Sequence, residues 1–166
     1  MNIFDNKIIQ RKINIKNNKN NSIKPRIFED KINFNRMRLY RLNRVREQMK
    51  IHNISAVILF DPINIRYATD ARNMSLFTMH TLTRYVFIPL LGPVILFDYP
   101  KSEHLSKHLN TIDEIREVTS WDYFSSGEKV NEFATLWAQN INDLMKNYSL
   151  DKSSLAIDIC DPIGIQ

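Results

Sequence analysis

Apolar residues recur every three or four positions in two long stretches of the chain, which is the spacing of an amphipathic helix. In residues 34–52 the stripe consists of Leu39, Leu42, Val45 and Met49. In residues 128–148 it is longer and consists of Val130, Phe133, Ala134, Trp137, Ile141, Leu144, Met145 and Tyr148. Each stripe predicts a helix. A shorter helix is expected over residues 102–109, with Ser102 as its cap and with Leu105 and Leu109 facing inward.

The first of these helices has a basic side. Arg38, Arg41 and Arg44 mark a face away from its apolar stripe, and Glu47 offsets part of their charge. A row of arginines can bind phosphate, but charged helix faces are more commonly just solvated. We therefore expect a basic outer surface exposed to water.

Shorter apolar runs predict the strands. Residues 55–60 (SAVILF) form a continuous apolar run, as in a strand covered on both faces, and are expected to be a central strand. Residues 154–159 (SLAIDI) are expected to form a second short apolar strand. Residues 84–90 and 94–99 flank a Leu-Gly-Pro turn and predict a hairpin, with Pro89 at a strand end or an edge. Residues 114–121 alternate well enough for a further strand.

Strands separated by helices favour right-handed crossovers and a sheet covered on both faces. The expected fold class is α/β: a three-layer domain with a mixed β-sheet of about five or six strands and helices on both faces. Between residues 63 and 82 no period persists, so this stretch is expected to be an irregular, polar loop.

Composition and charge divide the chain into two parts. The 166 residues, 43% hydrophobic and 25% charged, suit one globular domain. The net charge of +5 lies in residues 1–24, where six basic side chains face only Asp5, while the rest holds 17 basic and 17 acidic residues. Pro25 is the expected boundary. We expect residues 1–30 to be a disordered, basic, Asn/Lys-rich extension and residues 31–166 to be the folded domain.

Composition also limits location and partners. One cysteine, Cys160, excludes a disulfide framework, and no segment is apolar enough to cross a membrane or to serve as a secretory signal. These features predict a cytoplasmic protein without membrane partners. The basic extension leaves open a stand-alone module that binds nucleic acid or dimerises, but no aromatic residues interleave its charges, so nucleic acid is the less favoured partner.

Several familiar chemical motifs are missing or incomplete. Three scattered glycines cannot form a phosphate-binding loop. His104 and His108 have helical metal-site spacing, but a metal needs further ligands. Cys160 has no histidine near it in sequence and is expected to be an inert thiol. His80 would serve acid–base chemistry with Asp61 and Asp70 only if the fold brought the three together.

The segment that follows the central apolar strand, residues 61–74 (DPINIRYATDARNM), is the best candidate site. Loops at the carboxyl ends of strands present ligand-binding groups in α/β sheets. Arginines would pair with a carboxylate, asparagines would fix amides and a tyrosine would form a wall with a polar tip. The candidate substrate-binding residues are Asp61, Asn64, Arg66, Tyr67, Arg72 and Asn73. The alternative is structural, with Asp61 and Asn64 building a turn and Tyr67 packing a helix against the sheet.

Residues 41–74, RLNRVREQMKIHNISAVILFDPINIRYATDARNM, resemble the start of the creatinase, prolidase and Xaa-Pro aminopeptidase superfamily. Its members have a helix with an RLxxLR-like beginning, an apolar strand and a DPxNIRYxTG-like loop. Here Asp70 stands in place of the usual glycine, so the backbone is expected to differ there. Arg72-Asn73-Met74 and Arg84-Tyr85 are closer to the dimethylsulfoniopropionate lyase branch. The resemblance extends over most of residues 41–166.

This resemblance implies a creatinase-like amino-terminal domain, which is non-catalytic and shapes the dimer interface and the substrate entrance. A second, pita-bread domain holds the catalytic groups and the divalent metal of a complete family enzyme, and it is absent from this sequence. The chain is therefore expected to have no catalytic residue, metal ligand or cofactor of its own and to be a fragment, a split gene product or a stand-alone domain. The implied partners are a pita-bread domain in cis or in trans, a second copy in a homodimer, and a small-molecule or dipeptide substrate.

Overall fold

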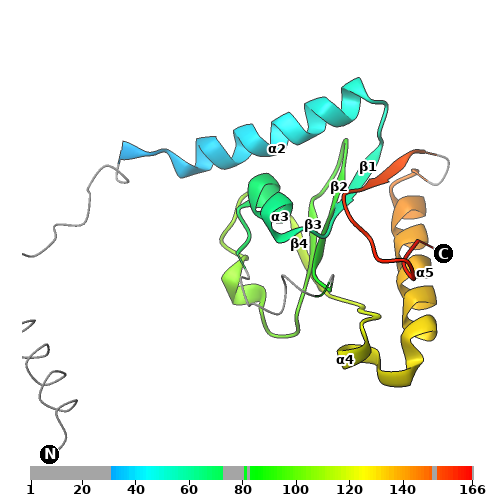
Figure 1. Cartoon of the computed structure of the whole chain (residues 1–166). Helices are drawn as coiled ribbons and strands as arrows, with labels where there is room; N and C mark the ends of the chain where they lie inside the picture. Colours follow the sequence, from blue (N-terminus) through cyan, green and yellow to red (C-terminus); the bar gives the residue numbers. More distant parts are fainter. Residues whose placement is uncertain (1–30, 73–80, 82, 151–152, 166) are drawn as a thin grey trace, which may run out of the picture. The chain divides into compact units, whose positions relative to one another are not determined.

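The structure is a computed structural model, and it describes residues 31–72, 81, 83–150 and 153–165 (Figure 1). The expected extension, residues 1–30, lies outside the described residues. All the elements below belong to one compact unit, Phe34–Gln166. None of the helices in the described ranges has the combination of length and apolar character that crossing a bilayer requires.

A mixed sheet forms the centre of the unit. Its strands are β1 (Ala56–Leu59), β2 (Tyr85–Pro89), β3 (Ile95–Asp98), β4 (Glu114–Glu117) and β5 (Leu155–Ile157), in the order β4-β3-β2-β1-β5. The β1–β2 and β2–β3 pairs are antiparallel, and the β3–β4 and β1–β5 pairs are parallel. The expected mixed sheet is confirmed, with β1 inside it and Pro89 ending β2.

Helices cover both faces of this sheet (Figure 1). Two long helices, α2 (Phe34–Ile51) and α5 (Val130–Asn147), confirm the two long helices predicted from the apolar stripes. Between them in the sequence come α3 (Pro62–Thr69) and the short α4 (Tyr123–Ser126). Helices α2 and α3 pack against one face, and α5 packs against the other. The three-layer α/β architecture is therefore confirmed.

Alternate residues of the strands belong to two separate hydrophobic cores, one on each face of the sheet. On the α5 face the core is rich in rings, including Phe60, Tyr85, Phe87, Phe97, Trp121 and Trp137. On the α2–α3 face it is aliphatic, including Leu42, Val57, Ile65, Val86, Ile88 and Leu96. Because side chains of a strand point alternately to opposite faces, neighbouring residues such as Val86 and Phe87 belong to different cores.

Three local expectations are wrong. The stretch read as a loop after residue 62 begins with α3. Residues 102–109 contain only a 3-10 turn, η3 (Glu103–Leu105), in which Ser102 makes no side-chain cap and Leu105 is exposed, although Leu109 is buried. In α2, Leu39 is exposed, and Arg38 is not on a solvated face but folds back to pair with Asp70.

Candidate functional site

The segment after β1 turns directly into a helix because of its first two residues. Asp61 is extended, and its carboxylate accepts hydrogen bonds from the backbone N–H groups of Ile63 (2.7 Å) and Asn64 (3.1 Å). Pro62 occupies the first helical position, where a missing N–H costs nothing. Asp61 is therefore the N-cap of α3, and its negative charge interacts favourably with the positive end of the helix dipole.

A residue from the far end of the unit completes this corner. One carboxylate oxygen of Asp158, just beyond β5, accepts from the Phe60 N–H (2.8 Å). Its other oxygen accepts from the Asp61 N–H (3.1 Å) and from the Asn64 side-chain amide (3.0 Å). Asp158 thus ties the ends of the parallel strands β1 and β5 to the start of α3, and Asn64 is part of that tie.

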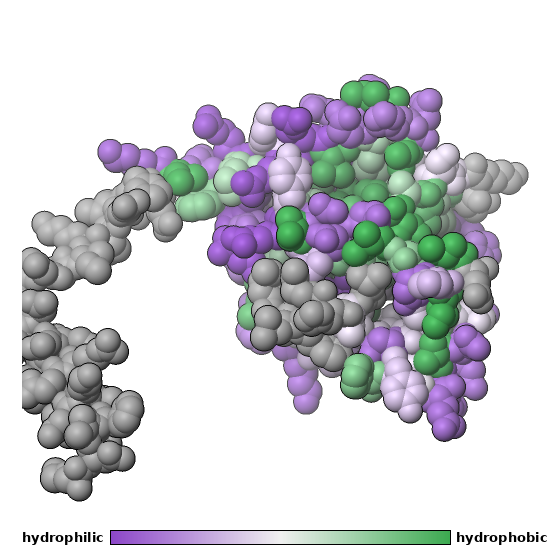
Figure 2. Space-filling model, viewed as in Figure 1, coloured by the Kyte–Doolittle hydropathy of each residue, from purple (hydrophilic) through white to green (hydrophobic). Residues whose placement is uncertain are grey.

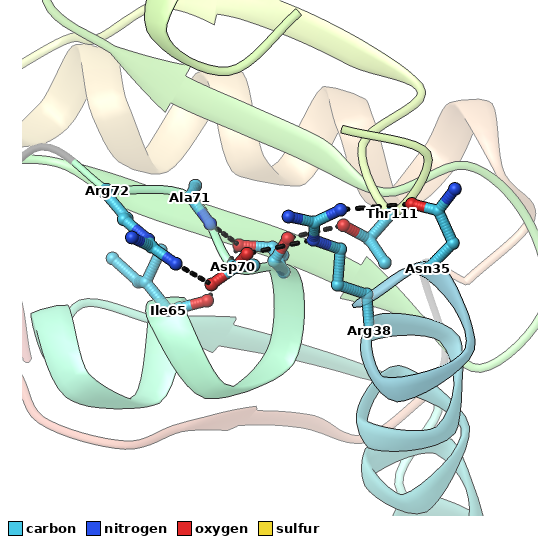
Figure 3. Close-up of polar contacts among 8 residues, drawn as sticks. Asn35, Arg38, Ile65, Asp70, Ala71, Arg72 and Thr111 are labelled. Atoms are coloured by element: carbon cyan, nitrogen blue, oxygen red, sulfur yellow. Dashed lines mark hydrogen bonds and ion pairs between the residues drawn. The ribbon is translucent and has the colours of Figure 1, made fainter. Parts of the chain in front are cut away.

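The other end of α3 is closed by a buried carboxylate. Asp70 has a φ of 63° and is only 6% exposed. Arg38 Nε from α2 donates to one Asp70 oxygen at 2.9 Å, and a terminal nitrogen of Arg72 lies 3.4 Å from the other (Figure 3). The backbone at Asp70 has the left-handed conformation that favours glycine, so the difference expected from an aspartate at this position is not seen, and the cost of a side chain there is offset by this pairing.

The surroundings of Asp70 act on its ionisation in opposite directions. Burial alone raises the pKa of the Asp70 carboxyl, but the hydrogen bond from Arg38 and the charges of Arg72 and Arg38 together outweigh it. The pKa consequently lies below its ordinary value. Asp70 is ionised at neutral pH and is suited to hold two helices together rather than to exchange a proton.

Threonine side chains reinforce the same end of the helix (Figure 3). The Thr69 hydroxyl donates to the Ile65 carbonyl at 2.7 Å and accepts from the Ala71 N–H at 3.1 Å. The Thr111 hydroxyl donates to the Thr69 carbonyl. Because these groups are buried, each needs such a partner, and the exit of α3 is fixed by them.

A groove lies between α2, β1 and α3, with a volume of about 280 Å³. We call it the α2–α3 groove. Its floor is formed by Val45, Met49, Ile54 and Val57, and its rim by Arg44, Gln48, His52 and Tyr67. The Arg41 guanidinium rests 5.6 Å from the centre of the Tyr67 ring. In Figure 2 apolar surface, in green, appears below the polar band of α2.

The predicted site residues therefore occupy different places along α3. Asp61 and Asn64 lie at its start, Tyr67 borders the groove and Arg72 lies beside Asp70 at its end. Arg66 is exposed, and Asn73 lies outside the described residues. Of the five that the structure describes, only Tyr67 lines the groove. Their role in substrate binding stays a prediction.

Acid–base chemistry with Asp61 and Asp70 is not favoured by this arrangement. The two carboxylates lie at opposite ends of the eight-residue helix α3, which is about 12 Å long. His80, the third residue of the predicted acid–base group, lies outside the described residues.

A divalent metal does not fit the side chains that the structure describes, because no three His, Cys, Asp or Glu residues among them are grouped to hold an ion. His104 and His108 are exposed, and the region does not form the α-helix that would align them. Cys160 is half-buried, and burial, helped by the charge of Asp161, raises the pKa of its thiol. The thiolate is disfavoured, as expected for an inert cysteine.

Sequence reasoning missed Asp158 and the inward role of Arg38. Asp158 is the charged position in the mainly apolar run 154–159 and lies just beyond β5, and Arg38 lies 32 residues before its partner Asp70. Only the unusual acid in place of glycine at position 70 hinted that a cation was needed nearby.

Residues 41–161 match the family of Creatinase/Prolidase N-terminal domains. The dimethylsulfoniopropionate lyase DddP of Roseovarius nubinhibens is 32% identical over 123 residues, and that of Roseobacter denitrificans is 31% identical over 122. Both alignments cover 74% of this chain, but 28% and 27% of the respective lyases. The chain thus spans less than a third of the length of these curated relatives.

Among solved structures, an Xaa-Pro aminopeptidase from Streptococcus pyogenes matches with a TM-score of 0.42 and 15% identity, covering 74% of this chain and 92% of the other. One from Streptococcus thermophilus matches with a TM-score of 0.40 and 15% identity, covering 76% and 94%. Structural similarities this distant do not support any conclusion about function. The family match, which spans well over half of the chain, confirms the resemblance read from residues 41–74. The chain belongs to the creatinase/prolidase N-terminal domain family.

Proposed function

We propose that this chain is the amino-terminal, non-catalytic domain of a two-domain enzyme related to dimethylsulfoniopropionate lyases. The observation that carries the proposal is the 32% identity to a lyase over a segment that makes up only 28% of it. Most of that lyase lies outside the similar segment. In this proposal a pita-bread domain, in cis or in trans, supplies the divalent metal and the catalytic groups.

The role we assign to this domain is to shape a homodimer interface and a substrate entrance. Its exposed polar side chains near α3, Arg66, Tyr67 and Arg72, are available to meet a small molecule or a dipeptide. The lyase relatives favour dimethylsulfoniopropionate, whose carboxylate an arginine would pair with. Asp61 and Asn64 contribute indirectly, since they fix the start of the helix that carries these groups.

Complementation tests the proposal. The full chain is assayed alone, with added divalent metal, for consumption of dimethylsulfoniopropionate and of an Xaa-Pro dipeptide by proton NMR. It is then joined to the part of the Roseovarius nubinhibens lyase that lies outside the similar segment. We expect no turnover by the chain alone and lyase activity in the chimera. Turnover by the chain alone would refute a non-catalytic role, and an inactive, folded chimera would refute the lyase assignment.

A substitution in the same chimera tests the substrate entrance. Arg72→Ala removes an exposed guanidinium, and we expect a KM for dimethylsulfoniopropionate raised about tenfold, with kcat and dimerisation unchanged. Lys146→Ala, on the exposed side of α5 across the sheet, is the matched control and should change neither constant. Equal effects of the two substitutions would exclude Arg72 from the entrance.

A further inference from the structure

Helix α2 carries a marked excess of positive charge that the domain itself only partly uses. It contains six basic residues and one acidic residue, Glu47. Arg38 pairs with Asp70, and Arg46 donates to the carbonyls of Pro89 (3.2 Å) and Gly92 (2.7 Å). These two arginines attach α2 to the rest of the domain, so their donors are used by contacts within it.

Arg41 and Arg44 are different: Arg44 lines the α2–α3 groove, Arg41 lies over the ring of the rim residue Tyr67, and neither forms an ion pair within the described ranges. Arg41 lies over the Tyr67 ring, and Arg44 lies 5.9 Å from the centre of the Tyr40 ring, whose hydroxyl accepts a hydrogen bond from it at 3.4 Å. A guanidinium has five N–H donors, so most remain unused in such a contact. The tyrosines hold these cations in place without neutralising them.

The groove beside these cations is apolar at its floor, and none of the described residues that line it is acidic. Its volume, about 280 Å³, is slightly below the usual range for small-molecule pockets. It suits one aliphatic side chain better than a whole cofactor. An occupant that fills it would be drawn by burial of its apolar part and by attraction of any negative charge next to it.

Apolar surface continues from the groove along both helices. On α2, Tyr40, Arg44, Gln48 and Ile51 follow one another at spacings of four, four and three, which places them on one helical face. Tyr40 is 59% exposed and Ile51 is 66% exposed. On α3, Ile63, 64% exposed, precedes Tyr67 by one turn. These exposed side chains lie on the two helices that flank the groove, and tyrosine and arginine are both enriched at protein–protein interfaces.

We propose that the α2–α3 groove binds an acidic peptide segment that inserts one aliphatic side chain between Val45 and Val57 and pairs its carboxylates with Arg41 and Arg44. The apolar floor gives the anchor, and the two arginines, whose charge Glu47 offsets only in part, give the charge complementarity. Single-stranded nucleic acid fits less well, because bases stack on open aromatic faces and the guanidiniums already cover one face of Tyr40 and of Tyr67.

The test uses the full chain and a fluorescein-labelled peptide of sequence Glu-Glu-Leu-Glu-Glu, with binding followed by fluorescence anisotropy at low ionic strength. We expect saturable binding that weakens about tenfold when the leucine is replaced by serine, since a buried leucine supplies that much. Arg44→Glu should weaken binding by about tenfold as well. Arg44→Gln, which is milder, serves if circular dichroism shows that Arg44→Glu is misfolded.

Lys50→Glu is the matched control, because it makes the same charge change on the same helix. Lys50 follows Gln48 by two residues, so it lies about 200° around the helix from the groove rim. We expect its effect to be less than twofold. The proposal is overturned by no peptide binding, by equal loss in Lys50→Glu, by equal binding of the serine peptide, or by Arg44-dependent binding of oligouridylate that is tighter than that of the peptide.

Discussion

The two faces of the sheet are stabilised in different ways. The α5 face holds a cluster of rings, in which Trp137 lies 4.6 Å from Trp121 and 5.9 Å from Phe60, measured between ring centres. The α2–α3 face has an aliphatic core, but charged pairs are set into it. Arg84 and Asp98, at 3.1 Å, are almost fully buried there, and Asp70 with Arg38 joins the two helices.

The difference teaches that the α5 face depends on packing, whereas the α2–α3 face depends partly on ionisation. Ring packing involves no ionised group and does not depend directly on pH, whereas Asp70 stabilises its face only while its carboxylate is charged. The exposed groups proposed to meet ligands, Arg44, Tyr67 and Arg72, all lie on the side that carries the buried ion pairs. Substitutions on the two faces should therefore differ in their pH dependence as well as in magnitude.

The largest effect is expected on the ring-rich face. Trp137→Ala removes a side chain that is 5% exposed and contacts several rings, and it should lower the free energy of unfolding by about 3–5 kcal/mol. Urea titration followed by circular dichroism would measure this. Leu136→Ala, at a neighbouring position that is 44% exposed, should cost less than about 1 kcal/mol. Similar losses for both would mean that α5 is not packed through Trp137.

A slightly smaller loss is expected from the buried pair on the other face. Asp98→Asn leaves the Arg84 charge buried without its partner and should cost about 3 kcal/mol in the free energy of unfolding. Glu117 stands opposite Asp98 on β4 but is exposed, so Glu117→Gln should be nearly neutral in the same urea titration. If Asp98→Asn were as mild as Glu117→Gln, the pair would have no importance for this face.

The smallest effect, and the most dependent on pH, concerns Asp70. Asparagine also tolerates a positive φ, so Asp70→Asn tests the charge and should cost about 1–2 kcal/mol at pH 7. The native pKa lies below the ordinary value of 3.8, so below that pH the unfolded chain binds the proton more readily. The stability from this carboxylate is present above about pH 4 and is lost as the pH falls through the native pKa.

Urea midpoints of the natural chain and of Asp70→Asn should therefore converge below pH 4. Asp143→Asn is the control, because Asp143 is exposed and its nearest cation, Lys146, lies 3.7 Å away; its difference from the natural chain should stay small at every pH. A gap for Asp70→Asn that remained constant with pH would contradict the ionic role.

Much of the fold could be predicted because local patterns agree with tertiary packing. The stripe that includes Trp137, Ile141 and Leu144 predicts α5, and all three residues are buried on the sheet. The runs on either side of Gly92 predict the β2–β3 hairpin. In these elements the apolar period alone determines which side chains enter the core, so no distant information is needed.

Where polar contacts decide the structure, the sequence alone was insufficient. The structural alternative assigned Asp61 and Asn64 to a turn, although aspartate followed by proline is also typical of an N-cap with proline in the first helical position. The eight residues of α3 are too few for a lasting period. The cap that Asp158 adds comes from a residue 98 positions after Phe60, and no local pattern reports such a contact. For the same reason the sequence could indicate the candidate substrate-binding residues but not their positions relative to one another.

The position of Asp158 has a consequence for how the domain folds during synthesis. The N–H groups of Phe60 and Asp61 leave the ribosome long before the carboxylate that accepts their hydrogen bonds, and β5 pairs with β1 over a similarly long separation. Such contacts are slow to form because a long loop must close first. The β2–β3 hairpin can form early, while the corner that orients α3 is completed only when the last strand of the sheet arrives.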